Sequence, residues 1–159
     1  MRVRWLAVPV LALAACSPAP KSAQPPDGFP DLNSFTAVNP DDPRSTLPSF
    51  HMPDQIGCVV DFGSQQSIVC SGSSIGLPQG VAGTGCPVIR KADGAADDAP
   101  YTFERAKREC ETSRAMPVPA GQKVVGKNGT CAVGDDMVAC IDADDKHGFV
   151  LKPSDSWAF

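Results

Sequence analysis

Six cysteines between residues 58 and 140 constrain the fold of this chain more than any other feature. They are Cys58, Cys70, Cys86, Cys110, Cys131 and Cys140. An even set at these spacings in a small exported domain indicates a disulfide framework, for which six cysteines allow fifteen connectivities. A zinc site and a redox site would both need closely spaced cysteine pairs of the C-x-x-C type, and the sequence contains none. We therefore expect structural disulfides, no metal and no cofactor.

The seventh cysteine, Cys16, ends an export signal. The chain has two arginines among its first four residues, continues with an apolar run over residues 6–13, and reaches the tetrapeptide Leu13-Ala14-Ala15-Cys16, which reads as a bacterial lipobox. In such a signal the cysteine thiol receives diacylglycerol and the chain is cut before it, so residues 1–15 are predicted to be a lipoprotein signal peptide. The apolar run is too short for a membrane span, which needs roughly 20 residues. An ordinary cleaved signal peptide and a buried N-terminal helix are the alternatives.

Lipid attachment at Cys16 predicts a protein of the cell envelope, anchored to the membrane and extracytoplasmic. The full chain has 14 basic and 18 acidic residues, and loss of residues 1–15 removes two arginines, which leaves a net charge of about −6. An acidic protein has no electrostatic attraction for nucleic acid or anionic head groups. We expect no nucleic acid partner, membrane contact through the lipid alone, and a partner in the envelope that is a protein, a glycan or a lipid.

Residues 16–49 are predicted to form a disordered, lipid-anchored tether, followed by a disulfide-rich β domain over residues 50–159. The tether contains Pro18, Pro20, Pro25, Pro26, Pro30, Pro40, Pro43 and Pro48. Proline removes amide donors and fixes φ, so regular structure cannot run through this segment. A proline-rich recognition motif is an alternative, and so is packing of the distal end, around Phe35 and Leu47, on the domain.

Local sequence pattern favours disulfides between cysteines that are neighbours along the chain. Residues 131–133 and 138–140 read as two strands, and a two-residue loop at 135–136 would place Cys131 opposite Cys140 in a non-hydrogen-bonded pair, where a cross-strand disulfide fits. Asp-Asp is a poor turn sequence, so a longer loop with another register stays open. The same reasoning brings Cys58 near Cys70 and leaves Cys86 for Cys110.

The pattern elsewhere predicts a mainly β fold, a small disulfide-stapled antiparallel domain with at most one short helix. Short β-type runs lie at residues 56–62, 67–70, 123–125, 129–133, 137–142 and 148–151. Residues 100–114 are ambiguous. Asp98 and Pro100 would suit the start of a helix, whereas Tyr101, Phe103 and Arg105 alternate as in a strand.

Several motifs together resemble a known group. They are Phe50-His51-Met52-Pro53, Ile56-Gly57-Cys58, Cys86-Pro87, residues 118–122, Gly129-Thr130-Cys131, residues 147–151, Trp157 and Phe159. The chain resembles an uncharacterised six-cysteine family of small secreted or lipid-anchored proteins from mycobacteria and related actinobacteria. That resemblance implies a β-rich disulfide domain, favours a strand around Cys110, and brings no catalytic residues. The chain departs from the family pattern between Ser71 and Gly80, where a tryptophan is expected.

Three further patterns bear on chemistry. Gly72-Ser73-Ser74-Ile75-Gly76 fits G-x-S-x-G, but a serine hydrolase of that type needs a large parallel sheet that this domain cannot house. The two histidines, His51 and His147, lie far apart in the chain. Residues 142–145 partly match a calcium loop without its glycine order or its bidentate glutamate.

We therefore expect no catalytic residues and a non-catalytic binding or structural module. A small envelope hydrolase and a surface-presented enzyme inhibitor are the alternatives. Trp157 and Phe159 alternate at the C-terminus, which favours a last strand pinned on the core over an exposed binding patch.

Overall fold

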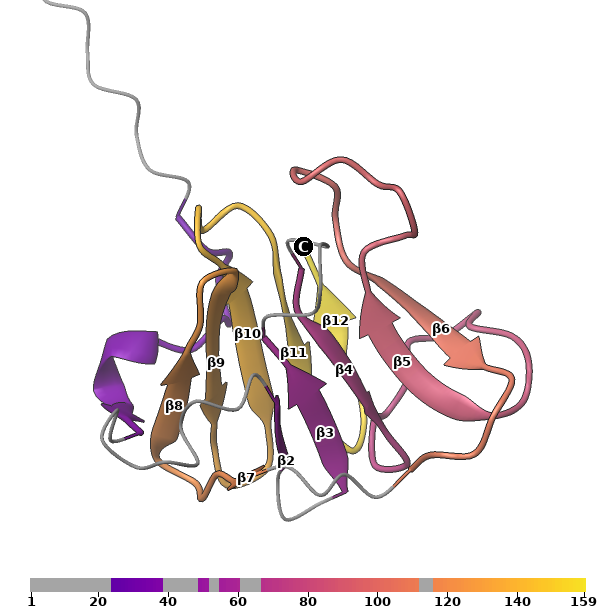
Figure 1. Cartoon of the computed structure of the whole chain (residues 1–159), viewed down its shortest axis with the longest axis horizontal. Coiled ribbons are helices and arrows are strands. Elements are labelled where there is room, and N and C mark those ends of the chain that lie inside the picture. The colour runs from indigo at the N-terminus through magenta and orange to yellow at the C-terminus, as the bar shows by residue number, and fades with distance from the viewer. Residues whose placement is uncertain (1–23, 39–48, 52–54, 61–66, 112–115) are drawn as a thin grey trace, which may run out of the picture.

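The computed structural model describes residues 24–38, 49–51, 55–60, 67–111 and 116–159, which form two packed β-sheets (Figure 1). In chain order the described elements are η1 (Leu32–Ser34), β1 (Thr36–Ala37), β2 (Ser49–His51), β3 (Ile56–Val59), β4 (Val69–Gly72), β5 (Cys86–Arg90), β6 (Thr102–Ala106), β7 (Met116–Pro117), β8 (Gln122–Val125), β9 (Gly129–Val133), β10 (Val138–Asp142), β11 (Gly148–Leu151) and β12 (Trp157–Ala158). The predicted mainly antiparallel β domain with three disulfides is confirmed.

The two sheets have the same topology. Sheet A has the order β1-β8-β9-β10-β11-β12, and sheet B has the order β6-β5-β4-β3-β2-β7. Each contains a meander of five consecutive antiparallel strands. One further strand pairs in parallel with the first strand of each meander, β1 with β8 and β7 with β2. Because β1 precedes the sheet B meander and β7 precedes the sheet A meander, each half of the chain contributes one strand to the other half's sheet. This exchange ties the two sheets together.

A short sequence motif recurs at the same place in both meanders. Cys-x-Val lies at the second strand and Ile/Val-x-Cys at the third, at residues 58–60 with 68–70 and again at residues 131–133 with 138–140. In both cases the cysteines are directly opposite each other, with Cα atoms 4.1 Å apart. The flanking valines and isoleucine point the same way because side chains two apart share one face of a strand. The repeated motif therefore produces the same disulfide-linked hairpin twice.

These two hairpins meet at the centre of the molecule. The sulfur atoms of Cys58, Cys70 and Cys140 lie within 4.8 Å of one another, so the disulfide of sheet B contacts the disulfide of sheet A. Ile89, Phe149 and Leu151 pack in the same core, and all three are fully buried. Each such side chain contributes about 1.5–3 kcal/mol through burial, and each disulfide roughly 3 kcal/mol in the chain-entropy model.

The hairpin between β9 and β10 has the register that the sequence favoured. Val133 lies opposite Val138, and Cys131 lies opposite Cys140. The Gly134 N–H donates to the Met137 carbonyl over 2.9 Å, which closes a two-residue loop at 135–136. The alternative of a longer loop with another register is therefore wrong.

Residues 102–106 form a strand, which settles the ambiguity between residues 100 and 114. Strand β6 pairs with β5 over five residue pairs, and Phe103 lies opposite the buried Ile89. Alternation of Tyr101 and Phe103 on the inner face outweighs the helix-forming residues that follow, because the extended chain buries the Tyr101 ring and packs the half-buried Phe103 ring against the core. The helix alternative is wrong. The strand expected around Cys110 ends at Ala106, four residues before that cysteine.

Residues 24–38 belong to the fold, which corrects the predicted tether over residues 16–49 and the domain boundary at residue 50. The chain is free of proline between Pro30 and Pro40, and this stretch holds η1 and β1. The Asp31 side chain accepts the Asn33 N–H over 2.9 Å at the start of η1. A few proline-free residues suffice for one helical turn and a two-residue strand. Residues 16–23 and 39–48 of the predicted tether lie outside the described residues.

Candidate functional site

All six predicted cysteines form disulfides, and their exposure divides them into two groups. Cys58–Cys70 and Cys131–Cys140 are buried at 0–1% exposure. Cys86–Cys110 lies at the edge of sheet B, where Cys86 is 4% exposed and Cys110 is half-buried. These are the three pairs that the sequence favoured. The predicted lipid attachment residue, Cys16, lies outside the described residues.

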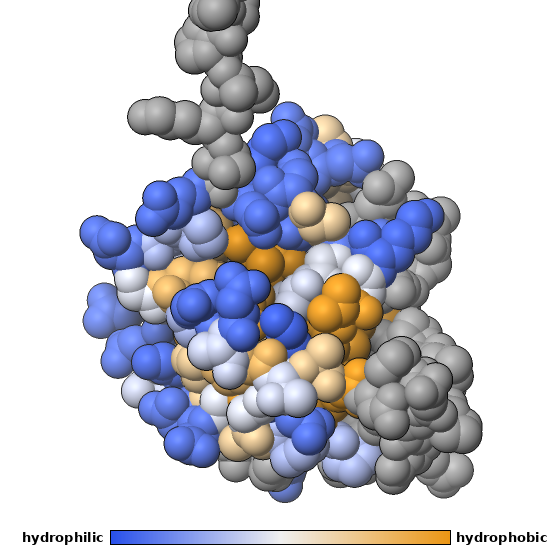
Figure 2. Space-filling view, turned by 90° about the vertical axis from the view of Figure 1, so that its left-hand side faces the viewer, coloured by the Kyte–Doolittle hydropathy of each residue, from blue (hydrophilic) through white to orange (hydrophobic). Residues whose placement is uncertain are grey.

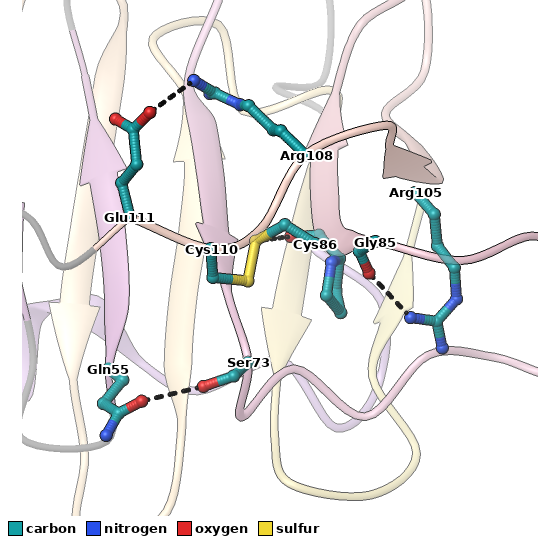
Figure 3. Close-up of a disulfide and its surroundings, with 9 residues drawn as sticks. Gln55, Ser73, Gly85, Cys86, Arg105, Arg108, Cys110 and Glu111 are labelled. Atoms are coloured by element: carbon teal, nitrogen blue, oxygen red, sulfur yellow. Dashed lines mark hydrogen bonds and ion pairs between the residues drawn. A yellow bond between two sulfur atoms is a disulfide. The ribbon is translucent and has the colours of Figure 1, made fainter.

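Ser73 of the serine motif and His147 have separate hydrogen-bond partners. The Ser73 hydroxyl, just after β4, donates to Gln55 Oε1 over 2.9 Å (Figure 3). His147 Nδ1 lies 3.1 Å from the carbonyl oxygen of Phe159, so this ring holds the C-terminus. His147 is not hydrogen-bonded to Ser73 or Ser74, and the side chain of His51 lies outside the described structure. The motif is a turn between β4 and the following loop.

In the acidic stretch at residues 142–145, two of the three carboxylates are already paired with lysines. Asp142 points into the molecule, where Oδ2 accepts from Lys91 Nζ at 2.7 Å and Oδ1 accepts from the Tyr101 hydroxyl at 2.5 Å. The Asp144 carboxylate pairs with Lys146 at 3.0 Å, which lowers the pKa of Asp144. Two of the acids in the stretch are thus already neutralised by lysines.

Asp142, Lys91 and Tyr101 form a buried polar cluster that joins the two sheets. Asp142 ends β10 in sheet A. Lys91 directly follows β5 and Tyr101 directly precedes β6, so they lie at the two ends of the loop that connects these strands of sheet B. The Lys91 and Asp142 side chains are only 6% and 8% exposed. Lys91 also donates to the Asp97 carbonyl, and the Tyr101 hydroxyl accepts the Ile68 N–H over 3.2 Å. A buried ion pair needs such additional bonds to offset its desolvation.

This polar cluster was not among the sites predicted from the sequence, although strand alternation indicates it. Counting in twos from Cys140 puts Asp142 on the inner face, and counting in twos from Ile89 puts Lys91 there as well. A charged residue at an inward position directly after an apolar strand requires a buried partner. Which acid met which base depended on how the two sheets were stacked.

Burial and the Asp142 carboxylate keep the Tyr101 hydroxyl neutral. Burial disfavours the phenolate, and the bond to Asp142 stabilises the protonated form, so the pKa of Tyr101 lies well above its ordinary value of about 10. The ring also packs edge-on against Phe149, with centroids 4.9 Å apart. The geometry is that of a structural hydrogen bond within the core.

The outer face of sheet A is covered. Strands β10 and β11 are buried along their whole length, which means that both of their faces are shielded from solvent. Residues 24–38, which we call the N-terminal strap, run along this face (Figure 1). The Phe29 ring packs against the Phe159 ring at 5.4 Å, and Lys123 Nζ donates to the Leu32 carbonyl over 2.8 Å.

A hollow of about 470 Å³ remains between the strap and sheet A. Its walls come from the strap residues Gln24, Pro25, Phe29, Pro30, Asp31, Leu32 and Asn33, and from Lys123, Thr130, Ile141 and Asp145. Figure 2 shows this side of the molecule, where apolar surface lies recessed between hydrophilic side chains. Polar and apolar groups contribute to the lining in similar measure.

The outer face of sheet B carries a groove of about 500 Å³, a volume typical of small-molecule sites. Its floor consists of Gly57, Val59, Val69, Ser71 and Val88, and its walls of Arg90, Glu104, Arg105, Ala106 and Arg108. The alternating burial of β3 and β4 shows that one face of these strands is shielded less than the other. We regard this groove, hereafter the sheet B groove, as the candidate binding site.

Two arginines on the wall of the sheet B groove, Arg90 and Arg108, are held in ion pairs. Arg90 Nε donates to Glu104 over 2.6 Å, and its Nη1 contacts Asp93 at 2.5 Å. Arg108 lies 3.4 Å from Glu111. The Glu104 carboxylate raises the pKa of Arg90. The groove therefore combines an aliphatic floor with ion pairs at its rim, where solvent screening weakens each pair.

Arg108, which contributes to one wall of the groove, lies in a segment without regular structure, residues 107–111, which we call the wall segment. This segment turns back over the start of β5, where the Cys86 N–H donates to the Arg108 carbonyl over 2.8 Å. Gly85 has φ +106°, and a Cβ there would lie 1.9 Å from the Ala106 carbonyl oxygen, so only glycine permits this approach. The Cys86–Cys110 disulfide closes the arrangement (Figure 3).

Potential metal ligands gather at one point only in the part of the chain that the structure describes. They are the sulfurs of Cys58, Cys70 and Cys140, and each of these belongs to a disulfide and cannot act as a thiolate ligand. Over the same residues, no helix has the length and apolar character needed to cross a bilayer.

Comparison with known proteins yields no relative from which a function could be transferred. The sequence matches no protein-family model, no curated protein and no solved structure. The resemblance to the six-cysteine actinobacterial family therefore stays a prediction.

Proposed function

We propose that this protein is a lipid-anchored component of the bacterial cell envelope whose domain is a non-catalytic binding or structural module. The observation that carries the proposal is the distribution of the seven cysteines. Six are paired within the domain, and the remaining one, Cys16, ends the lipobox. Such pairing is stable in an oxidising compartment outside the cytoplasm.

The anchor is tested by metabolic labelling of the full-length chain with a palmitate analogue in a bacterial host, followed by membrane fractionation. We expect lipid label and membrane retention in the unmodified protein and loss of both in Cys16→Ala. Retention of Cys16→Ala in the membrane, with residues 1–15 removed, would contradict the proposal.

Within this proposal the sheet B groove is the binding surface. Its aliphatic floor is partly exposed at Val59 and Val69, whereas the corresponding face of sheet A is occupied by the strap. An apolar floor with polar groups at the rim is the usual composition of a recognition site. The ligand is a cell-envelope protein, glycan or lipid with an apolar portion that fits the floor.

Crosslinked envelopes offer a direct test of the groove. The anchored protein and its Val69→Asp variant are captured, with Val125→Asp as the matched control because Val125 is 64% exposed on β8, away from the groove. We expect the same envelope component with the unmodified and control proteins and its loss with Val69→Asp. Identical capture by all three proteins would rule out the groove as the binding surface.

A further inference from the structure

The three disulfides differ in how a solvent molecule can reach them. Those at the centre of the molecule lie between the sheets, and their four cysteines are 0–1% exposed. Cys110 is the only half-buried cysteine among the six, and it lies in the wall segment rather than in a strand. A thiol can therefore approach Cys110 while the sandwich stays folded, whereas attack at the centre requires the sheets to separate.

The consequences of breaking these bonds differ as well. Strands β5 and β6 stay paired through their own ladder of five residue pairs, whether or not Cys86 and Cys110 are joined. The wall segment has no such ladder. Besides the disulfide, the bond between the Cys86 N–H and the Arg108 carbonyl holds it to β5.

We propose that Cys86–Cys110 is a redox modification site at which a small thiol opens the disulfide and releases the wall segment from the sheet B groove. The other two disulfides stay intact in this reaction. Because Arg108 lines the groove, release of residues 107–111 withdraws this side chain from its wall and widens the groove on that side. This inference goes beyond the proposed function and needs neither the lipid anchor nor an identified ligand.

The chemistry is thiol–disulfide exchange with a dithiol as the reductant. A thiolate of the dithiol attacks Cys110 Sγ, the protein S–S bond breaks, and Cys86 leaves as a thiolate that takes up a proton. The second thiol of the reductant then attacks its own sulfur in the mixed disulfide. Cys110 leaves as a thiolate and takes up the proton that this second thiol has lost. The reductant leaves as an intramolecular disulfide. Two electrons pass from the dithiol to the protein disulfide.

Two positive side chains flank this disulfide. Arg105 Nη1 donates to the Gly85 carbonyl over 3.0 Å, and Arg108 contacts Glu111 on the other side of the sulfur atoms (Figure 3). Each guanidinium group is held by a partner of its own, the Gly85 carbonyl or the Glu111 carboxylate. The position of the disulfide at the edge of the sheet, with Cys110 half-buried, is therefore what opens it to a thiol in solution.

Time-resolved alkylation tests the proposal on the full-length chain carrying Cys16→Ser, so that the remaining thiol takes no part. The native protein is treated with dithiothreitol, samples are alkylated, and peptides are mapped by mass spectrometry. We expect Cys86 and Cys110 to be labelled at least about a hundredfold faster than the other four cysteines, because those require near-global opening. Labelling of all six at one rate, or of Cys58 and Cys70 first, would overturn the proposal.

A variant that mimics the reduced state separates local release from unfolding. In Cys86→Ser/Cys110→Ser on the same background, we expect native β-sheet circular dichroism and faster amide hydrogen exchange confined to residues 107–111 and the adjoining start of β5. Exchange that is unchanged in the wall segment, or raised throughout β5 and β6, would show that the disulfide does not control this wall. Both readouts are independent of any ligand.

Discussion

The two outer faces of the sandwich begin from the same topology and end in different states. Each belongs to a five-stranded meander with a disulfide between its second and third strands. On sheet A the strap covers the face, and β10 and β11 are buried throughout. On sheet B the strands β3 and β4 alternate between buried and half-buried residues.

The small residues of sheet A explain how its outer face could be covered. Ala132 and Ala139 lie opposite each other on this face and are 0% exposed. A Cβ on Gly148 would lie 2.8 Å from the Phe159 ring, so glycine is needed for the last residue to pack down. On sheet B the equivalent positions are valines, with arginines at the rim. The comparison shows that two faces with the same topology differ in their cover: Ala132 and Ala139 are fully buried, whereas Val59 and Val69 stay partly exposed.

The largest loss of stability is expected from a change in the buried polar cluster that joins the two sheets. Asp142→Ala leaves Lys91 buried without its partner, and we expect a loss of about 3–5 kcal/mol in the free energy of unfolding. Urea denaturation measures the loss. Asp144→Ala, in the exposed part of the same stretch, serves as the control and should change little. If both variants unfold at the same urea concentration, the cluster does not join the sheets as described.

The second prediction tests the two faces directly with the same substitution. Ala139→Glu introduces a charge beneath the cover of sheet A and should cost more than about 3 kcal/mol, whereas Val69→Glu on sheet B should cost less than about 1 kcal/mol. Thermal and urea unfolding of both variants give the comparison. Equal losses would mean that the two faces are covered to the same degree.

A smaller effect is expected from loosening the strap alone. Phe29→Ala removes the ring that packs on Phe159, and we expect a loss of about 1–2 kcal/mol. Limited proteolysis should then cut the strap faster while the rest of the domain resists. Asp27→Ala, at an exposed position of the same segment, is the matched control. Unchanged cleavage in Phe29→Ala would show that this ring does not hold the strap.

The smallest perturbation is a titration without any substitution. Tyr101 is the chain's single tyrosine, so absorbance at 295 nm reports on it alone. Its raised pKa predicts no tyrosinate in the native protein at pH values where the urea-unfolded chain, with a pKa of about 10, has already ionised. The bond to Asp142 therefore contributes its full stability below pH 10, and this contribution falls as pH rises further. Coincident titration of native and unfolded protein would contradict the buried hydrogen bond.

Local sequence patterns were sufficient to predict the hairpins and the disulfides. Around Cys131 and Cys140, alternation of apolar residues set the inner face, and the four residues between the strands set the register. Contacts of this kind are close in sequence, so their geometry follows from strand periodicity and loop length. The same holds for Cys58 and Cys70.

Contacts between distant parts of the chain could not be predicted in this way. Lys91 and Asp142 are separated by 51 positions, and their meeting depends on the stacking of two sheets. The same is true of the strap. Its prolines argued for a tether, whereas its contacts are made with residues of sheet A more than 90 positions later, such as Lys123.

Local features of the sequence were enough to predict the class of the fold, its three disulfides and an anchored, exported protein. These predictions follow from periodicity, cysteine spacing and a short motif. The position of the strap on one face, the buried ion pair between the sheets and the exposure of one disulfide of three became visible in the folded molecule alone. Burial decided each of these points, because it depends on what packs above a residue and not on the residue's neighbours in the chain.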